Sequence, residues 1–138
     1  RQAFVQALHY VRGRSAFGRA IADQPLMQNV LADMAIESEA MLTLTLRIAR
    51  AFDEADEDDT AAQLRRVGPP LVKYFVCKMA PAYAAEALEC MGGNGYIENH
   101  PLARLYREAP LNCIWEGSSN MVCLDVLRAL ARDEALLD

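Results

Sequence analysis

The 138-residue sequence has few cysteines and histidines, and those it has are widely spaced. Its four cysteines form no Cys-x-x-Cys pair, and its two histidines stand far apart, at positions 9 and 100. Metal sites and disulfide frameworks depend on characteristic spacings of such residues. We therefore expect no metal site, and we expect reduced thiols in an intracellular protein. The cysteines are Cys77, Cys90, Cys113 and Cys123.

Long hydrophobic runs and an excess of positive charge are also missing. No apolar run approaches the roughly 18 residues that suggest a membrane-spanning helix, and we expect neither such a helix nor a signal peptide in this sequence. The net charge is −5, and the largest block of charge, DEADEDD at residues 53–59, is acidic. We interpret this block as a solvated loop between helices, and it would repel nucleic acid rather than attract it.

Helical periodicity, in contrast, covers most of the sequence, and there is no alternating strand pattern of any length. The first helix is predicted to run from Gln2 to about Arg14. A second, long helix is predicted to open at Pro25 and to stop at the acidic block. Because the sequence begins with Arg1 and is already within a helical pattern, we expect it to be a fragment of a longer protein.

A third helix is predicted to start at Gly68-Pro69-Pro70 and to end at Gly92-Gly93. Pro81 lies inside it and cannot donate a hydrogen bond to the carbonyl of Cys77, so we expect a kink there.

The rest of the sequence is predicted to alternate between short loops and helices. A compact loop at residues 94–100 precedes a short helix from 101 to about 107. A non-helical stretch follows residues 109–110, and residues 118–120 (SSN) supply N-cap candidates for a last helix. The sum is an all-α, up-down bundle of about four main helices, with residues 1–138 as one domain.

Three segments are not explained by a helical bundle alone: residues 14–18 (RSAFG), 91–96 (MGGNGY) and 114–118 (IWEGS). Taken singly, the glycine-rich segment is typical of a helix C-cap, although glycines also let a ligand approach the backbone closely. A lone Glu116 is typical of a solvated charge that the dipole of the following helix favours.

Together, the three segments resemble the C-terminal domain of the acyl-CoA dehydrogenases in order and spacing. Residues 14–18 are similar to that family's Arg-x-x-Phe-Gly turn, and residues 91–96 to its Gly-Gly-x-Gly loop. Residues 105–108 (LYRE) match its Arg-acid pair, and residues 115–118 (WEGS) its aromatic-Glu-Gly-Thr/Ser segment. The resemblance covers nearly the whole chain and implies an FAD-dependent enzyme.

Details of the same segments look most like the alkylation-response (AidB-like) branch of that family. Members of this branch are bacterial flavoproteins that are linked to protection against DNA alkylation and that bind DNA. Glu89 departs from the typical dehydrogenase, which has Gln three residues before the glycine pair, and this puts a flavin contact at that position in doubt. Ala16 replaces the hydroxyl residue that is common before the Phe.

The resemblance implies that Glu116 is the catalytic base. In this family the base removes the proton α to a thioester carbonyl while the β-hydride moves to the flavin. A carboxylate suits this task if burial raises its pKa towards the working pH, and Trp115 would help to desolvate it. The backbone N–H of Glu116, with a flavin ribityl hydroxyl, would polarise the thioester carbonyl.

The resemblance also implies the residues that bind FAD. Arg14 would hold the pyrophosphate, usually across a subunit interface, with a guanidinium fork suited to that group. Phe17 and the glycines would lie around the same cofactor, and Ser118 near the flavin itself. Because the rest of the site lies in other domains, we expect the isolated chain to be inactive. The glycines are Gly92, Gly93 and Gly95.

Three hypotheses about function remain. The first is a cytoplasmic bacterial acyl-CoA dehydrogenase of fatty acid metabolism, which acts as a homo-oligomer and passes electrons to an electron-transfer flavoprotein. The second is an alkylation-response flavoprotein that protects DNA and has weak dehydrogenase activity. The third is a helical bundle that serves only assembly. The acidic charge balance favours the first over the second, and the combination of Arg14, the glycine loop and Glu116 disfavours the third.

Overall fold

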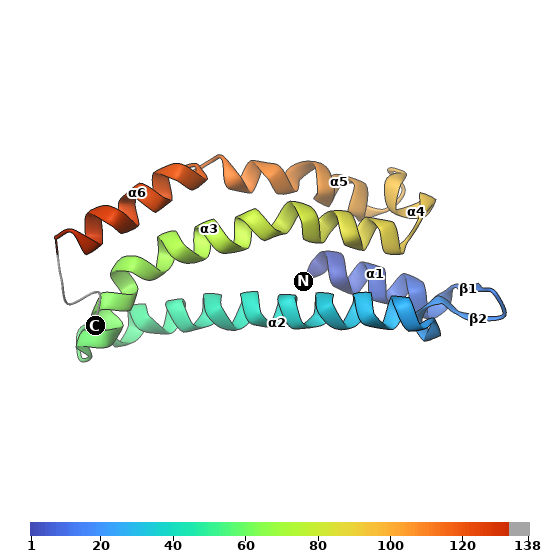
Figure 1. Cartoon of the computed structure of the whole chain (residues 1–138), viewed down its shortest axis with the longest axis horizontal. Helices are drawn as coiled ribbons and strands as arrows, with labels where there is room; N and C mark the ends of the chain where they lie inside the picture. The colour runs from blue at the N-terminus through green and yellow to red at the C-terminus, as the bar shows by residue number, and fades with distance from the viewer. Residues whose placement is uncertain (133–138) are drawn as a thin grey trace. The chain divides into compact units, whose positions relative to one another are not determined.

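The computed structural model describes residues 1–132, and almost all of them are helical, which confirms the all-α fold class. Within this part of the chain, a hairpin of two short strands is the one sheet, and no helix is long and apolar enough to cross a membrane. In chain order, the elements in Figure 1 are α1 (Gln2–Gly13), β1 (Ser15–Ala16), β2 (Arg19–Ala20), η1 (Ile21–Asp23), α2 (Pro25–Glu54), α3 (Asp59–Cys90), α4 (Gly93–Tyr96), α5 (Pro101–Glu108), η2 (Ala109–Cys113) and α6 (Ser119–Leu130).

The chain divides into two compact units. The first consists of Arg1–Ala40 and Met79–Pro110, and the second of Met41–Lys78 and Leu111–Asp138. The helices α2 and α3 each pass from one unit into the other. That residues 1–138 act as a single domain stays a prediction.

Both small and large side chains are buried in the first unit. On α1, the buried residues Ala3, Ala7 and Val11 recur every four positions and therefore share one face of the helix. The buried Tyr83 of α3 donates a hydrogen bond from its hydroxyl to the main-chain oxygen of Met34 on α2, at 2.8 Å. This bond satisfies the polar end of a large core side chain and links α2 to α3.

The third helix begins at Asp59 and not at Gly68, so this prediction was wrong. Asp58 caps it, because a side-chain oxygen of Asp58 accepts a hydrogen bond from the backbone N–H of Thr60, at 2.8 Å. Gly68 lies inside α3, where a Cβ atom would overlap the side chain of Ile48 on α2. The Gly-Pro-Pro sequence thus marks a close contact between two helices rather than the start of one.

The acidic block at residues 53–59 is a loop only at its centre, so the prediction of a solvated loop was wrong at both ends. Its first two residues end α2, and its last residue begins α3. An acidic residue in the first turn of a helix is favoured by the helix dipole. The charges therefore help to define the start of α3.

The remaining elements follow the predictions more closely. The helices predicted to begin at Pro25 and Pro101 do so. Part of the predicted loop at 94–100 belongs to the short helix α4, and the stretch predicted to be non-helical contains the 3₁₀ helix η2. The last helix, α6, has Ser118 at its N-cap position, although the Ser118 hydroxyl makes no capping hydrogen bond.

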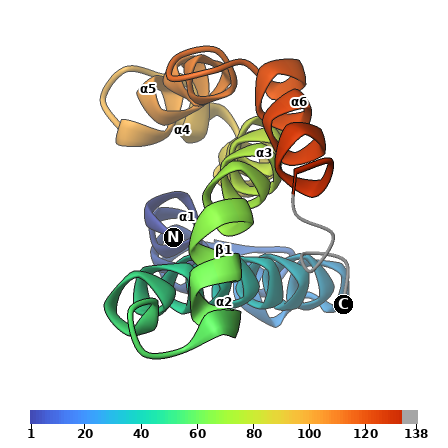
Figure 2. The same cartoon turned by 90° about the vertical axis from the view of Figure 1, so that its left-hand side faces the viewer.

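In the second unit, α6 lies beside α3, as Figure 1 and Figure 2 show. An ion pair joins the two helices: the guanidinium of Arg66 donates to both carboxylate oxygens of Asp125, at 3.0 and 3.1 Å. A planar guanidinium fits a carboxylate in this two-bond geometry, which links α6 to α3.

Candidate active site

Arg14 lies directly after α1, at the entrance to the tight hairpin of β1 and β2. The two strands pair antiparallel, which leaves Phe17 and Gly18 as the turn residues, with φ angles of 54° and 82°. Turns with two positive φ angles match the natural twist of a hairpin. Gln24 supports the turn, since its side-chain amide donates to the main-chain oxygen of Ala16 at 3.2 Å.

The hairpin presents two side chains that nothing else in the described residues holds. The ring of Phe17 is 97% exposed at the tip of the turn. Arg14 is also exposed, and within residues 1–132 its guanidinium makes no hydrogen bond or ion pair. An unpaired guanidinium can bind an anion, and an uncovered aromatic ring can stack against a flat group.

The three glycines of the loop after α3 have different structural reasons to be glycine. Gly92 has a φ of 57°, a conformation that suits glycine at the end of a helix. Gly95 is buried, and a Cβ atom there would overlap the main chain of Leu88. Gly93 has an ordinary φ, and a Cβ atom added to it would meet nothing within 4 Å. Only Gly93 therefore has no structural reason within the described chain to be glycine.

A hydrogen bond ties the glycine loop to α1. The side-chain amide of Asn94 donates to the hydroxyl oxygen of Tyr10, at 2.8 Å. Tyr10 lies one helical turn before Arg14, and the backbone N–H of Arg14 donates to the main-chain oxygen of Tyr10 at 3.0 Å. The structure thus connects the glycine loop to the entrance of the hairpin. Sequence reasoning missed this link, because no local pattern marks a contact across 84 residues.

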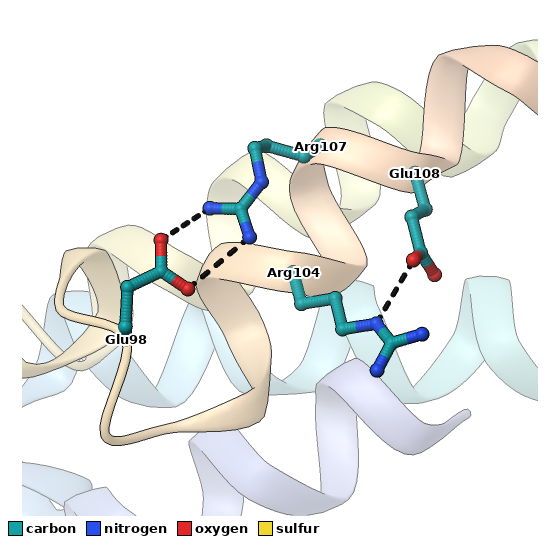
Figure 3. A network of polar contacts seen from close by, with 4 residues as sticks. All are labelled: Glu98, Arg104, Arg107 and Glu108. Carbon is teal, nitrogen blue, oxygen red and sulfur yellow. Dashed lines mark hydrogen bonds and ion pairs between the residues drawn. The ribbon is translucent and has the colours of Figure 1, made fainter.

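Ion pairs hold the segment that follows the glycine loop, as Figure 3 shows. Arg107 donates to both carboxylate oxygens of Glu98, and Arg104 donates to Glu108 at 2.9 Å. The neighbouring Arg107 and Glu108 therefore each pair with another residue. The first pair anchors the loop before α5 to that helix.

Glu116 lies in a tight turn between η2 and α6. Its φ is 53°, and that of the next residue, Gly117, is 97°. A non-glycine residue in this left-handed region costs of order 1–3 kcal/mol, so the surrounding contacts must hold the turn. The Glu116 side chain is exposed, and its backbone N–H makes no hydrogen bond within residues 1–132.

The side chains of Lys73 and Cys113 hold the segment before Glu116 against α3, and sequence reasoning missed both of these residues. The ammonium of Lys73 donates to the main-chain oxygens of Asn112 and Trp115, the latter at 2.9 Å. The thiol of Cys113 donates to the main-chain oxygen of Cys77 at 2.9 Å. Pro81 has no N–H to donate to that oxygen, so the Cys113 thiol takes the place of the missing backbone donor.

Comparison with known proteins identifies the fold. Residues 1–131 match the family model described as acyl-CoA dehydrogenase, C-terminal domain. The chain belongs to the acyl-CoA dehydrogenase family. This confirms the resemblance on which the sequence interpretation depends, and with it the type of helical domain.

Two similar proteins match almost the whole of this chain. AidB of Escherichia coli (strain K12) is 44% identical over 138 residues, or 100% of this chain and 25% of AidB. The structure of ACDH-11 of Caenorhabditis elegans in complex with C11-CoA has a TM-score of 0.94 and 32% identity, over 99% of this chain and 23% of that one.

A third comparison shows the same domain in a more distant member. The butyryl-CoA dehydrogenase of Megasphaera elsdenii has a TM-score of 0.80 and 28% identity, over 94% of this chain and 32% of that one. The chain therefore spans about a quarter to a third of the length of these acyl-CoA dehydrogenases.

The candidate residues of this acyl-CoA dehydrogenase domain fall into two groups. Arg14, Phe17 and the glycine loop belong to the first unit, where the bond between Tyr10 and Asn94 connects them. Glu116 and Ser118 belong to the second unit, on either side of Gly117.

The expectation that Trp115 helps to shield the Glu116 carboxylate from water stays a prediction. Within the described residues, Trp115 is 54% exposed and Glu116 is exposed too. The positive φ of Glu116 turns the chain sharply between the two side chains. Within the described residues alone, the Glu116 carboxylate therefore faces water.

The first unit also contains a groove of ≈ 410 Å³ that sequence reasoning did not foresee. Methionine and tyrosine side chains are among its lining residues, together with three carboxylates, from Asp33, Glu37 and Glu86. Three negative charges disfavour a phosphate or carboxylate ligand. The groove is therefore a poor site for an anionic cofactor, in contrast to the unpaired Arg14.

Proposed function

We propose that the complete protein is an FAD-dependent acyl-CoA dehydrogenase in which Glu116 removes the α-proton of an acyl-CoA thioester. The observation that carries this proposal is the Glu116 turn. It offers an exposed carboxylate and an unpaired backbone N–H on one residue, held in a left-handed conformation that the chain maintains through contacts to α3.

The residues of this chain fit FAD in charge and in shape. The unpaired guanidinium of Arg14 suits the pyrophosphate, and the exposed ring of Phe17 suits a flat aromatic group. Gly93 leaves room for close approach to the backbone, and the hydroxyl of Ser118 is not used as a helix cap. When bound, FAD supplies the acceptor for the β-hydride.

Glu116 has two tasks in the proposed reaction. Its carboxylate accepts the α-proton, which becomes more acidic when negative charge on the thioester oxygen is stabilised. Its backbone N–H donates a hydrogen bond to that oxygen, as in an oxyanion hole. Because the carboxylate is exposed here, the proposal requires the bound substrate and the other domains to exclude water around it.

The test of this proposal is the substitution Glu116→Gln in the complete protein. Gln keeps the shape of the side chain and the backbone N–H, but it cannot accept the α-proton. Loss of a general base costs about 10²–10⁴-fold in rate. We therefore expect the variant to retain FAD and to bind thioester, while anaerobic bleaching of the flavin band after mixing with acyl-CoA falls by at least that factor.

The control is Glu57→Gln, which removes an exposed carboxylate from the same unit. It should bleach at the wild-type rate. Bleaching of Glu116→Gln at a rate close to wild type would show that the base lies in another domain. The acyl-CoA series should include several chain lengths, because the walls of the substrate pocket lie mostly outside this chain.

We further propose that the complete protein is a homo-oligomer and that it passes electrons to an electron-transfer flavoprotein. The exposed hairpin supports the first part, since Phe17 is uncovered and could reach a cofactor held by a neighbouring subunit. Light scattering of the complete protein with and without FAD tests the oligomer, and flavin reoxidation by an electron-transfer flavoprotein tests the acceptor.

Protection of DNA is the second candidate function, and the 44% identity to AidB is the observation that favours it. The net charge of −5 argues against a DNA contact through this chain, because DNA binding depends on cations that neutralise phosphates. A salt-dependent affinity of the complete protein for duplex DNA would support this second function.

A further inference from the structure

Lys73 occupies a special position relative to Glu116. It lies on α3, within the second unit, and its ammonium reaches across 42 residues of sequence to the main-chain oxygen of Trp115. It also donates to the main-chain oxygen of Asn112, at the end of η2. A lysine that only capped η2 would need the second contact alone. The contact to Trp115 lies beyond η2 and calls for another explanation.

The oxygen of Trp115 and the N–H of Glu116 belong to the same peptide group. A peptide group is planar, and in its trans form the C=O and the N–H point in opposite directions. The hold of Lys73 on the oxygen therefore also sets the direction of the N–H. Because the N–H has no partner within residues 1–132, it is free to donate away from Lys73.

The charge of Lys73 adds a second effect. An ammonium that binds a carbonyl oxygen withdraws electron density from the peptide group, and hydrogen bonds in series strengthen one another. The N–H at the other end of the same peptide group then becomes a stronger donor. The peptide group between Trp115 and Glu116 thus joins the Lys73 ammonium, at its oxygen, to the thioester oxygen, at its N–H.

We propose that Lys73 is a positioning residue of the active site, which aims and polarises the backbone N–H of Glu116 through the oxygen of Trp115. This inference rests on the proposed function, since it assigns a role to Lys73 in stabilising the thioester oxygen. Lys73 itself touches neither the substrate nor the transferred proton.

A second contact makes the proposal testable without loss of the fold. The hydrogen bond from the Cys113 thiol to the main-chain oxygen of Cys77 holds the same segment on α3, one helical turn further on. Removal of the Lys73 ammonium should therefore leave η2 in place while the peptide group before Glu116 loses its anchor.

The experiment uses the complete FAD-loaded protein as wild type, Lys73→Met, Lys73→Arg and Lys78→Met. Lys78 is the matched control, because it is exposed, lies on the same helix and makes no hydrogen bond or ion pair within the described chain. The readouts are FAD content, the rate of anaerobic flavin reduction by an acyl-CoA, and the infrared carbonyl stretch of a bound thioester labelled at C1.

We expect Lys73→Met to retain FAD and to reduce it about 10- to 100-fold more slowly, somewhat less than the cost of losing an oxyanion-hole donor outright. The carbonyl stretch should move to higher frequency, towards that of free thioester, because a weaker hydrogen bond polarises the carbonyl less. Lys73→Arg should restore part of both changes, and Lys78→Met should match the wild type.

Two results would overturn the proposal. One is a wild-type rate in Lys73→Met, and the other is a slower rate with an unchanged carbonyl stretch, which would show a purely structural role. If Lys73→Met does not fold, Lys73→Gln removes the charge with a polar side chain and is judged by the same carbonyl stretch. If the flavin of the wild-type protein is not bleached by any acyl-CoA, the proposed function itself is refuted. This outcome differs from both results that would overturn the role of Lys73.

Discussion

The hairpin of the first unit and the Glu116 turn of the second each hold a non-glycine residue at positive φ, but by different means. The hairpin is supported by a neighbour in sequence, because Gln24 binds the oxygen of Ala16 eight residues away. The Glu116 turn is held by Lys73, which donates a hydrogen bond to the main-chain oxygen of Trp115, 42 residues away in sequence. A local motif depends little on the rest of the fold, whereas the turn depends on α3 and its packing.

Of the substitutions that compare the hairpin with the Glu116 turn, Arg14→Ala in the complete protein should have the largest effect, a loss of FAD binding. The substitution removes an unpaired, exposed cation and no core packing, so the hairpin and the helices should stay folded. Hydrogen bonds to charged groups contribute about 1.5–3 kcal/mol, which corresponds to roughly 10- to 100-fold weaker binding of FAD. Flavin content after gel filtration and an FAD titration of the apoprotein measure this.

The matched control is Arg12→Ala, which removes another exposed arginine two residues earlier on α1. Its flavin content should equal that of the wild type. Equal flavin content in Arg14→Ala and Arg12→Ala would instead identify Arg14 as an ordinary surface charge. Loss of helical signal in Arg14→Ala would contradict the view that the hairpin is a local, independent motif.

Two glycine substitutions in the first unit should differ in their effect on the unfolding free energy. Gly95→Ala places a methyl group against the main chain of Leu88, and such overpacking costs about 1–3 kcal/mol of unfolding free energy. Gly93→Ala meets nothing within 4 Å and should change the unfolding free energy by less than about 0.5 kcal/mol. Denaturant titrations of both variants measure the difference.

The same two substitutions distinguish a glycine needed for helix packing from a glycine needed for contact with FAD. If Gly93 is glycine because FAD approaches the backbone closely, then Gly93→Ala should weaken FAD retention in the complete protein without loss of stability. Unchanged flavin content in Gly93→Ala would remove that residue from the candidate site. Equal stability of the two variants would contradict the close contact between Gly95 and α3.

Much of the helical architecture could be predicted from the sequence, because periodicity and end signals are local. Pro25 and Pro101 mark helix starts, and Ser118 marks the N-cap of α6. The start of α3 could not be predicted in this way. Gly68-Pro69-Pro70 has the composition of a helix start, but the close approach to Ile48 explains Gly68 and the cap at Asp58 decides the boundary.

The candidate site shows the same division. Arg14, Phe17 and Glu116 could be named from short motifs, and their assignment as site residues stays a proposal. The groups that hold them in place could not be named. Lys73 and Cys113 have no local signal, since each contact joins residues that only the packing of α3 brings together. Long-range contacts of this kind are a property of the fold and not of any one segment.

The smallest expected effect concerns acid, and it compares one exposed ion pair from each unit. In the folded chain, the hydrogen bond from Arg107 lowers the pKa of Glu98 below its ordinary value of 4.5. The hydrogen bond from Arg66 lowers the pKa of Asp125 below 3.8 in the same way. A carboxylate whose pKa is lowered by folding stabilises the fold above its unfolded pKa, and this contribution is lost as the pH falls through the folded pKa.

Glu98→Gln and Asp125→Asn should therefore lower the melting temperature slightly at neutral pH, and the difference from wild type should shrink as the pH falls below 4.5 and 3.8 respectively. The effects should be small and should weaken with salt, because both pairs are exposed. Glu89→Gln, which alters an exposed carboxylate without an ion pair in residues 1–132, is the control substitution.

The two ion pairs also join different parts of the chain: Glu98 links a loop beside the glycine segment to α5, whereas Asp125 links α6 to α3. We accordingly expect Glu98→Gln to change local hydrogen exchange in residues 97–100, and Asp125→Asn to change exchange along α6. Identical exchange patterns in the two variants would show that neither pair has the local role that its position indicates.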